Sequence, residues 1–333
     1  MAFAAFVSFF PQLVAGPIER AANLLPQFYR KRVFDYHQAV DGLRQILWGL
    51  FKKVVIADNA ADMANVFFNA PADYPGSVLL LGAVFFAFQI YGDFSGYSDI
   101  AIGTARLFGF DLMRNFAYPY FSRDIAEFWR RWHISLSTWF RDYLYIPLGG
   151  SRGGTWMKIR NTFIIFIVSG FWHGANWTFI VWGALNALYF LPLLLTKKNR
   201  THLDIVAQDR LLPSPMEALR MLATFGATVL AWVFFRAENL THAFTYLKGI
   251  FSSTLLSLPK AMHFEEVGVH PAILVFFLAV MLVTEWLGRR QPYAIALAGT
   301  ALNGPFRYAF YYALVLFIFF FGGANQQFIY FQF

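Results

Sequence analysis

The chain of 333 residues contains no cysteine. Disulfide bonds, thiolate metal sites and cysteine nucleophiles are therefore excluded. Charged residues are scarce as well, because they make up only 14% of the chain, whereas soluble domains average about 25%. A chain with so few charges lacks the polar surface that a soluble globule of this length needs. The composition therefore favours a membrane protein.

Two sequence patterns of hydrolytic sites are also absent. The chain has neither an H-E-x-x-H zinc pattern nor a G-x-S-x-G nucleophile elbow. The apolar stretch from Met1 to Val14 lacks the basic residues that begin a signal peptide, so it reads as the end of a membrane segment. The sequence therefore predicts no metal site, no metalloprotease and no α/β-hydrolase.

Apolar residues, by contrast, are abundant: 58% of the chain is hydrophobic and 20% is aromatic. A helical membrane span needs roughly 20 apolar residues. The segment 161–172 rises only about 18 Å and is too short to cross, and 43–57 predicts an amphipathic or partly buried helix. We expect an all-α integral membrane protein, a multi-span bundle with re-entrant and interfacial helices that forms one domain over residues 1–333. The expected spans are 76–92, 176–195, 216–235, 271–288 and 305–322.

The net charge of +8 comes from lysines and arginines that gather between the apolar segments. This placement indicates attraction to anionic lipid headgroups rather than to nucleic acid. Basic residues are concentrated in 123–160, 197–210 and 289–290 and are sparse in 236–270. If 161–195 enters the membrane and returns as a hairpin, the positive-inside rule predicts that the first three connections lie inside the cell. The C-terminus then lies outside.

The first candidate site is the stretch from Ser169 to Trp177, where His173 and Asn176 lie between glycines within apolar sequence. Polar side chains at membrane depth are costly and usually face a cavity or the bundle interior. The glycines permit a helix break or close packing. A neutral imidazole at such a place can accept a proton from an attacking hydroxyl. The alternative is a histidine that hydrogen-bonds to a neighbouring helix and only packs.

The second candidate site is the stretch 123–143. On one continuous helix Trp129, His133 and Ser137 share a face, because they are spaced four residues apart. Adjacent arginine and tryptophan side chains suit a phosphate-bearing or planar ligand. The alternative is an interfacial helix whose tryptophans lie at headgroup level and whose arginines contact lipid phosphates.

A second stripe on the same expected helix alternates in charge. Arg123, Glu127 and Arg131 are spaced four residues apart, so their side chains are predicted to support one another as ion pairs.

Two further segments carry polar residues between glycines. The stretch from Tyr91 to Asp99 holds Asp93 and Ser95 and can orient a basic partner such as an arginine of the second site. A helix-capping loop is an equal alternative, with Asp99 capping a helix that runs through Leu107. The glycine-rich segment 149–154 favours a flexible cytoplasmic turn, because no Walker pattern follows it.

These stretches together resemble the membrane-bound O-acyltransferase family, in its bacterial branch of alginate O-acetylation and D-alanyl transfer to teichoic acid. The resemblance is carried by Phe9 to Ile18, Gly49 to Lys53, Tyr91 to Gly103, Phe128 to Gly150, Ser169 to Asn176 and the terminal Phe328 to Phe333. Members of this family carry further spans before the first of these stretches. The resemblance therefore implies that the family's N-terminal spans are missing from this chain.

The resemblance implies a multi-pass acyltransferase of the bacterial inner membrane, built as a family-like helical bundle. His173 is then a general base or stabilises the transferring acyl group, and His133, with Trp129 and Arg131, positions the donor or relays the acyl group. Asp93 and Asn176 orient these groups. The remaining substrate-binding candidates are Trp132, Ser137, Ser95, Arg141 and Trp172.

The implied reaction moves an acetyl group from a cytoplasmic donor for O-acetylation of an exported polysaccharide such as alginate. The donor is acetyl-coenzyme A or another acyl thioester, and no bound cofactor is implied. The implied partners are membrane lipid, an extracytoplasmic acetyltransferase and the polysaccharide acceptor, with no nucleic acid. One rival interpretation is a non-catalytic component that hands the acyl group to the extracytoplasmic enzyme. A lipid acyltransferase of the eukaryotic type is the other.

Overall fold

The computed structural model describes residues 1–257, 269–324 and 326–329, and within these residues the regular elements are all helices. The end of the terminal segment 328–333 and the middle of the connection 236–270 lie outside the described residues. The longer helices are α3 (Tyr36–Leu50), α4 (Asp58–Asn69), α5 (Gly76–Leu107), α8 (Gly154–His173), α9 (Trp177–Leu195), α10 (Pro215–Arg236), α11 (Leu240–Ile250), α12 (Pro271–Leu287) and α14 (Gly304–Phe321). The shorter α-helices are α1 (Ala2–Val7), α2 (Ala21–Leu24), α6 (Ile125–Arg131), α7 (Ile134–Phe140) and α13 (Ala298–Ala301). The 3₁₀ and π turns are η1 (Phe10–Gln12), η2 (Leu25–Tyr29), η3 (Phe51–Ala57), η4 (Pro71–Asp73), η5 (Pro119–Phe121) and η6 (Arg141–Tyr145).

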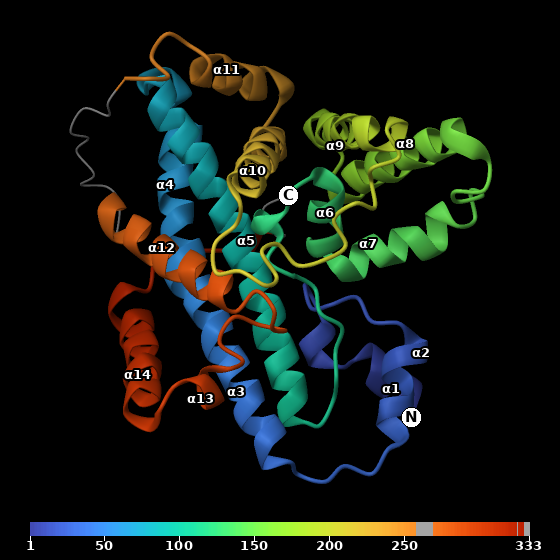
Figure 1. Cartoon of the computed structure of the whole chain (residues 1–333), viewed down its shortest axis with the longest axis vertical. Helices are drawn as coiled ribbons and strands as arrows, with labels where there is room; N and C mark the ends of the chain where they lie inside the picture. The colour runs from blue at the N-terminus through green and yellow to red at the C-terminus, as the bar shows by residue number, and fades with distance from the viewer. Residues whose placement is uncertain (258–268, 325, 330–333) are drawn as a thin grey trace.

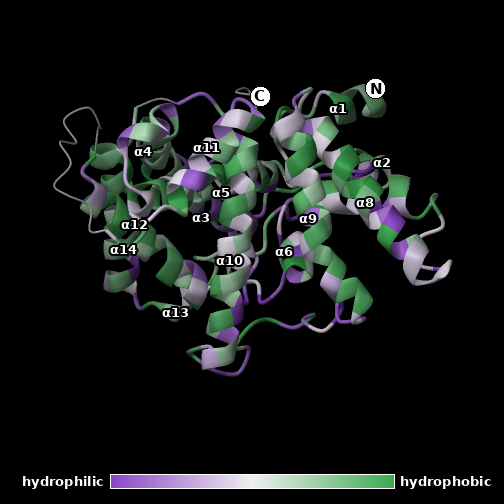
Figure 2. Cartoon of the chain, turned by 90° about the horizontal axis from the view of Figure 1, so that it is seen from above, coloured by the Kyte–Doolittle hydropathy of each residue, from purple (hydrophilic) through white to green (hydrophobic). Residues whose placement is uncertain are grey.

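Four described helices are long and apolar enough to cross a membrane: α5, α9, α10 and α14. They confirm four of the five expected spans. The fifth, α12, is apolar but only 17 residues long. In Figure 2 the helices are mostly hydrophobic, while hydrophilic residues gather in the connections and between helices. The prediction of an all-α membrane protein is confirmed.

Helix α5 is the centre of the molecule. Its 32 residues run beside the continuous helical stretch formed by α3, η3 and α4, as Figure 1 shows. At about 1.5 Å per residue, α5 extends about 48 Å. Helices α10 and α11 pack on its upper part, so α5 joins the two sides of the molecule.

Close approach of α3 to α5 requires glycine. A Cβ on Gly49 would lie 2.7 Å from the carbonyl oxygen of Gly96, and a Cβ on Gly96 would lie 2.8 Å from that of Gly49. Small residues that let backbones approach in this way are typical of helix interfaces in membranes. This contact brings the side chains of η3 directly against α5.

The π turn η3 carries two lysines into the polar face of α5. Lys52 donates to Ser95 at 2.9 Å and forms an ion pair with Asp99 at 2.6 Å. Lys53 forms ion pairs with Asp93 at 2.8 Å and with Asp58 on α4. The prediction of a partly buried helix over 43–57 is therefore confirmed, and its lysines are held by carboxylates.

The stretch from Tyr91 to Asp99 lies in the interior of α5, so the expected capping loop there is wrong. Asp99 caps no helix. The alternative, that the acids of this stretch orient a basic partner, is confirmed, but the partners are lysines of η3 and not an arginine of the second site. The reason is packing: α3 approaches α5 along its glycines, which brings Lys52 and Lys53 against α5.

The other side of the molecule is built from α6, α7 and the α8–α9 hairpin, with α10 against α9. Helix α8 begins at Gly154 and is 20 residues long, so it exceeds the apolar segment 161–172. Its first two turns carry the basic residues Lys158 and Arg160, and it is not among the four helices that are long and apolar enough to cross a membrane. The hairpin is tight because Gly170 and Gly183 each lie against the backbone of the opposite helix.

Candidate active site

A cavity of about 280 Å³ lies between the α6–α7 segment and helices α8, α9 and α10. His133 and His173 both line it. The lining also includes Trp129, Trp132, Ser137, Phe166, Ser169, Trp182, Trp232 and Phe235. Histidines that are 40 positions apart in the sequence therefore share one space, and eight of its 20 lining residues are phenylalanine or tryptophan.

His173 is the last residue of α8, and Gly174 ends the helix. A Cβ on Gly170 would meet the carbonyl oxygen of Phe179 at 2.3 Å, and one on Gly174 would meet the ring of Phe179 at 2.6 Å. Both glycines thus allow α9 to fold back directly after the histidine. The expected helix end and close packing at this motif are confirmed.

His133 lies at a break between two helices. Helix α6 ends at Arg131, and α7 begins at Ile134. His133 itself has φ 43° and ψ 55°, in the left-handed region that costs a non-glycine residue about 1–3 kcal/mol. The expected single helix over 123–143 is therefore wrong. The break is compensated by Asn115, whose carbonyl oxygen accepts from the Ile134 amide at 2.9 Å.

Despite the break between α6 and α7, the three residues that were predicted to share a helix face still lie together. Trp129, His133 and Ser137 all line the cavity, Trp129 from α6 and Ser137 from α7. Phe94 of α5 packs edge-on against the His133 ring, with centroids 4.6 Å apart. His133 is therefore held between α5 and the cavity.

Aromatic rings surround His173. The ring of Phe235 lies 5.0 Å from the imidazole, and the ring of Trp182 lies 5.3 Å from it. Trp182 in turn stacks on Trp232 at 5.7 Å. These rings give the half-buried histidine a largely apolar surrounding, which favours its neutral form.

Trp129 is oriented by a buried amide. Its indole N–H donates to the side chain of Asn186 on α9 at 3.1 Å, and Asn186 donates to the carbonyl of Trp182 at 2.8 Å. Asn186 is itself held by the backbone of α9, so this hydrogen bond fixes the orientation of the Trp129 ring at the cavity.

Burial lowers the pKa of His133 well below its usual range, and the nearby His173 acts in the same direction. The imidazole of His133 is therefore neutral near pH 7, and a neutral imidazole can accept a proton. Among the residues that the structure describes, no group of three or more His, Cys, Asp or Glu side chains could hold a metal ion.

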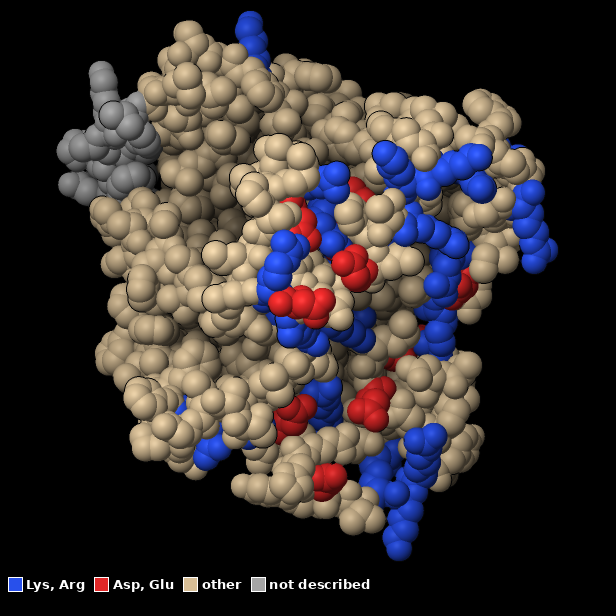
Figure 3. Space-filling view, viewed as in Figure 1, with Lys and Arg blue, Asp and Glu red and all other residues tan. Residues whose placement is uncertain are grey.

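A second hollow of about 560 Å³ adjoins the cavity, and we name it the vestibule. The two share Arg130, Ile165, Phe166, Phe190, Asn199 and Arg200, so the vestibule lies directly beside the histidine cavity. Its basic lining residues are Arg130, Arg141, Lys158, Lys197 and Arg200, and its lining includes no carboxylate. Figure 3 shows basic side chains gathered over this half of the molecule. The vestibule is thus suited to an anionic ligand.

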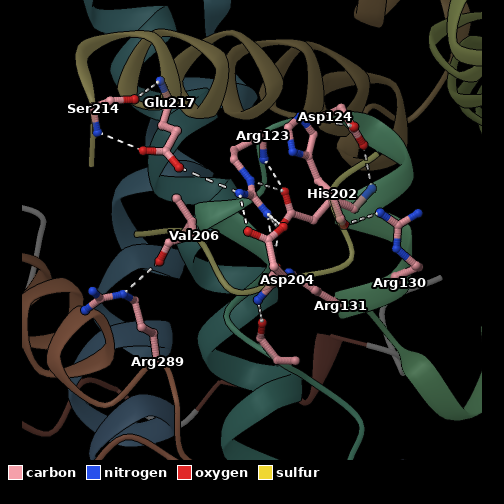
Figure 4. A network of polar contacts seen from close by, with 12 residues as sticks. Arg123, Asp124, Arg130, Arg131, His202, Asp204, Val206, Ser214, Glu217 and Arg289 are labelled. Atoms are coloured by element: carbon pink, nitrogen blue, oxygen red, sulfur yellow. Dashed lines mark hydrogen bonds and ion pairs between the residues drawn. The ribbon is translucent and has the colours of Figure 1, made fainter. Parts of the chain in front are cut away.

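The segment between α9 and α10 borders the vestibule and is held by backbone contacts. Arg130 donates to the carbonyl oxygens of Asn199 at 2.9 Å and of His202 at 2.7 Å. Arg131 donates to the carbonyl of Asp204 at 3.1 Å. Figure 4 shows how these side chains reach from α6 to the segment.

Buried ion pairs complete this attachment. The predicted ladder is confirmed: Glu127 pairs with Arg123 at 3.0 Å and with Arg131 at 2.7 Å. Arg123 also pairs with Asp204 at 2.9 Å, and this hydrogen bond lowers the pKa of the Asp204 carboxyl. Arg123 and Arg131 do not line the cavity, so their role in the structure is to hold the α6 region and the 196–214 segment together.

Several other predicted site residues lie away from the cavity lining. Asp93 and Ser95 face the lysines of η3. Asn176 caps α9 by accepting from the Thr178 amide at 3.1 Å and also donates to the carbonyl of Glu238. Trp172 is half exposed and contacts the His173 ring.

The remaining two predictions concern the rim of the vestibule. Arg141 lines it, although this side chain also pairs with Asp142. The glycine-rich segment 149–154 forms a turn before α8, with positive φ at Gly149, Gly150 and Gly154, as its composition predicted.

Two sets of lining residues escaped the sequence reasoning. The first is the aromatic wall, Trp182, Trp232 and Phe235; tryptophan and phenylalanine three residues apart in α10 are ordinary for a membrane helix. The second is the pair Lys158 and Lys197, which looked like simple connection charges. The sequence around these residues does not mark them as lining residues, because only the packing of α8, α9 and α10 brings them close to the histidines.

Comparison with known proteins adds to this geometry. The model of the membrane-bound O-acyltransferase family matches residues 1–235. The chain is 42% identical over 300 residues to the probable alginate O-acetylase AlgI of Azotobacter vinelandii, covering 89% of this chain and 56% of that protein. It is 43% identical over 258 residues to the peptidoglycan O-acetyltransferase of Helicobacter pylori, covering 77% of this chain and 47% of that protein.

A more distant relative is the teichoic acid D-alanyltransferase of Streptococcus thermophilus, which is 30% identical over 252 residues, or 70% of this chain and 60% of that protein. The chain thus spans about half the length of the curated relatives that it matches.

Proposed function

The chain belongs to the membrane-bound O-acyltransferase family, and from this premise we propose that it transfers an acetyl group to hydroxyl groups of an exported polysaccharide. The observation that carries this proposal is the shared cavity. The buried His133 and the half-buried His173 line one space, and that space adjoins a vestibule with five basic side chains and no carboxylate in its lining. Acyl transfer from a negatively charged donor requires a general base and, beside it, a basic surface that binds the donor. The histidines and the vestibule match these two requirements.

The chemistry needs one group that moves a proton. The neutral imidazole of His173 accepts the proton of the acceptor hydroxyl as its oxygen attacks the acyl carbon. The new C–O bond forms, the C–S bond of the thioester breaks, and the proton passes to the leaving sulfur. His133 lines the same cavity and supports the developing charge. The reaction is balanced without oxidant, reductant or metal.

The vestibule supports a donor that carries phosphate. Arginine binds phosphate through paired, bidentate hydrogen bonds, and lysine attracts it as a point charge. We therefore propose acetyl-coenzyme A or another phosphate-bearing acyl thioester as the donor. Trp129, Trp132 and Ser137 would lie against the acyl end, and Arg141 against the phosphate end.

The distribution of basic residues supports an orientation in a bacterial inner membrane. The vestibule arginines and lysines lie in the connections that the positive-inside rule assigns to the cytoplasm. The donor would therefore enter from inside, and the acceptor polysaccharide would be reached from outside, directly or through an extracytoplasmic acetyltransferase. The names of two relatives, an alginate O-acetylase and a peptidoglycan O-acetyltransferase, support a polysaccharide acceptor.

The test is polymer acetylation in cells that lack their own acyltransferase. They would be complemented by this chain, and by a chimera that adds the N-terminal part of the Azotobacter vinelandii relative. Each is compared with its His173→Ala variant. We expect acetylation to depend on His173 in every form that acetylates.

The matched control is Phe171→Ala, because Phe171 lies in the same turn of α8 as His173 but is exposed and does not line the cavity. Full acetylation by His173→Ala at equal membrane abundance would overturn the catalytic role. It would favour the rival in which the protein only passes an acyl group to an extracytoplasmic enzyme.

A further inference from the structure

A groove of about 510 Å³ lies on the side of the molecule away from the histidine cavity, between α3 and the first turns of α14. Figure 1 shows α14 and α13 beside the lower part of α3. The groove is lined by two arginines, one histidine, three tyrosines and three aliphatic residues: Arg44, Arg307, His37, Tyr36, Tyr308, Tyr311, Val40, Leu43 and Leu47. Its lining contains no carboxylate, and it shares no residue with the histidine cavity.

The two arginines of the groove converge on one glycine. Arg307 donates to the carbonyl oxygen of Gly299 at 2.8 Å. The guanidinium of Arg44 lies so close to Gly299 that a Cβ there would be 2.4 Å from its Nη2 atom. Helix α13 therefore brings two positive charges from different helices to the same place. Like charges held together repel unless an anion lies between them.

No carboxylate of the described residues neutralises this pair, since neither arginine forms an ion pair with one. The nearest acid along α3, Asp41, is engaged by Arg106 at 2.6 Å and by the hydroxyl of Tyr293. By contrast, the partly buried or buried arginines Arg20, Arg106, Arg123 and Arg131 each pair with a carboxylate. The Arg44–Arg307 pair is thus short of negative charge.

Two polar atoms at the groove are buried without a hydrogen-bond partner among the described residues. One is Nε of Arg44, and the other is the hydroxyl of Tyr311. A buried donor with no partner is destabilising, so native structures usually supply one. Both atoms are donors, and an oxygen-rich anion would satisfy them.

The surroundings of the groove are those of a membrane surface. Arg307, Tyr308, Tyr311 and Tyr312 occupy the first turns of α14, where tyrosine and arginine mark the headgroup level. Beyond them α14 is almost unburied, and Phe319 is 79% exposed. A ligand with a phosphate in the groove could therefore lay an acyl chain along α14.

We propose that this groove binds the headgroup phosphate of an anionic phospholipid, with Arg44 and Arg307 on the phosphate and Tyr311 as a hydroxyl donor. The aliphatic side chains of Val40, Leu43 and Leu47 contact its glycerol and upper acyl chain. A lipid, rather than free phosphate, is favoured because charged and apolar lining occur in one groove beside an exposed apolar helix. The site holds α14 to α3 through a lipid.

The test uses the full chain in detergent micelles and native mass spectrometry. Phosphatidylglycerol, phosphatidylcholine and inorganic phosphate are titrated in separate arms. We expect one phosphatidylglycerol to be retained per chain, with phosphatidylcholine at least tenfold weaker and inorganic phosphate unable to displace the lipid at equal concentration. In the Arg44→Gln/Arg307→Gln variant the affinity should fall about 30-fold, because each arginine near an anionic lipid contributes a factor of about five.

The matched control is Arg220→Gln on the exposed part of α10, which should retain wild-type lipid binding. Tyr311→Phe keeps both charges and the ring, so it keeps the test usable if the double variant fails to fold; we expect about fivefold weaker binding. The proposal would be overturned if Tyr311→Phe and the Arg44→Gln/Arg307→Gln variant both bound phosphatidylglycerol with the affinity of wild type. Equal binding of phosphatidylcholine, or displacement by inorganic phosphate, would also overturn it.

Discussion

Two regions of this molecule bury polar side chains, and they differ in the space that they leave. Around Lys52, Tyr91, Asp99 and Glu285 the free volume is about 10 Å³, room for one water molecule at most. Lys52 is bound by Asp99 and Ser95, and the Tyr91 hydroxyl donates to Glu285 at 2.9 Å. Around His133 and His173 the cavity holds about 280 Å³ and continues into the vestibule.

The comparison separates two uses of costly polar burial. In the closed region Lys52 of η3 pairs with Asp99 of α5, and Glu285 of α12 accepts from the Tyr91 hydroxyl, so the polar groups define how these elements pack. In the open region neutral imidazoles face a space that a ligand can fill. We therefore expect substitutions in the closed region to reduce stability, and substitutions in the open region to reduce activity in a protein that still folds.

The largest effect should come from the open region. His173→Ala is expected to lower kcat/KM for acetyl transfer by about 10²–10⁴-fold, the usual contribution of a general base. Membrane abundance and Tm should remain those of wild type. Activity assays on purified protein would show this directly. Loss of abundance instead of activity would mean that the two regions do not differ as described.

In the closed region, Lys52→Met should destabilise the protein by about 3–5 kcal/mol, because it leaves the Asp99 charge buried without its partner. Thermal unfolding in detergent measures this effect. The double variant Lys52→Met/Asp99→Leu should recover most of the loss, since it removes both charges. No recovery would contradict an ion-pair role for Lys52.

The glycine contact beneath these lysines should be sensitive to one methyl group. Gly96→Ala is expected to cost about 1–3 kcal/mol, because its Cβ would lie 2.8 Å from the Gly49 carbonyl. Gly226→Ala on α10 is the matched control, since a Cβ there meets nothing within 4 Å. That control should be neutral or stabilise by about 0.5–1 kcal/mol. Similar Tm losses in both variants would rule out a specific close approach.

At the vestibule we expect a smaller and purely kinetic effect. Lys158→Gln/Lys197→Gln should raise KM for the acyl donor about tenfold, or about 1.4 kcal/mol, and leave kcat nearly unchanged. Lys248→Gln on α11 serves as the control, because Lys248 does not line the vestibule. An unchanged KM with a lowered kcat would place these lysines outside donor binding.

The smallest effect concerns pH. Burial lowers the folded-state pKa of His133 below its unfolded value of 6.5. Below pH 6.5 the unfolded state therefore binds a proton that the folded state does not, so stability falls as pH falls. The His133→Gln variant should lose Tm less steeply between about pH 7 and pH 5 than wild type. Parallel Tm curves would contradict a buried neutral histidine.

Local sequence patterns were sufficient for much of this structure. The apolar runs predicted five spans, of which four are confirmed as membrane-capable helices, and the four-residue spacing predicted the ion pairs of Glu127 with Arg123 and Arg131. The spacing of Trp129, His133 and Ser137 predicted a shared location, although the helix that was to provide it is broken at His133. Such patterns succeed because they depend on neighbours within one or two helical turns.

Other features were decided only by the tertiary structure. The left-handed conformation of His133 depends on Asn115, and the pairing of Lys52 and Lys53 depends on the approach of α3 to α5. The meeting of Arg44 and Arg307 at Gly299 joins residues more than 260 positions apart. The composition determined that this chain belongs in a membrane, and its helical periods determined its elements. Which polar groups became paired and which were left facing open space was decided by helix packing, because the energy of a buried charge depends on partners that the local sequence does not contain.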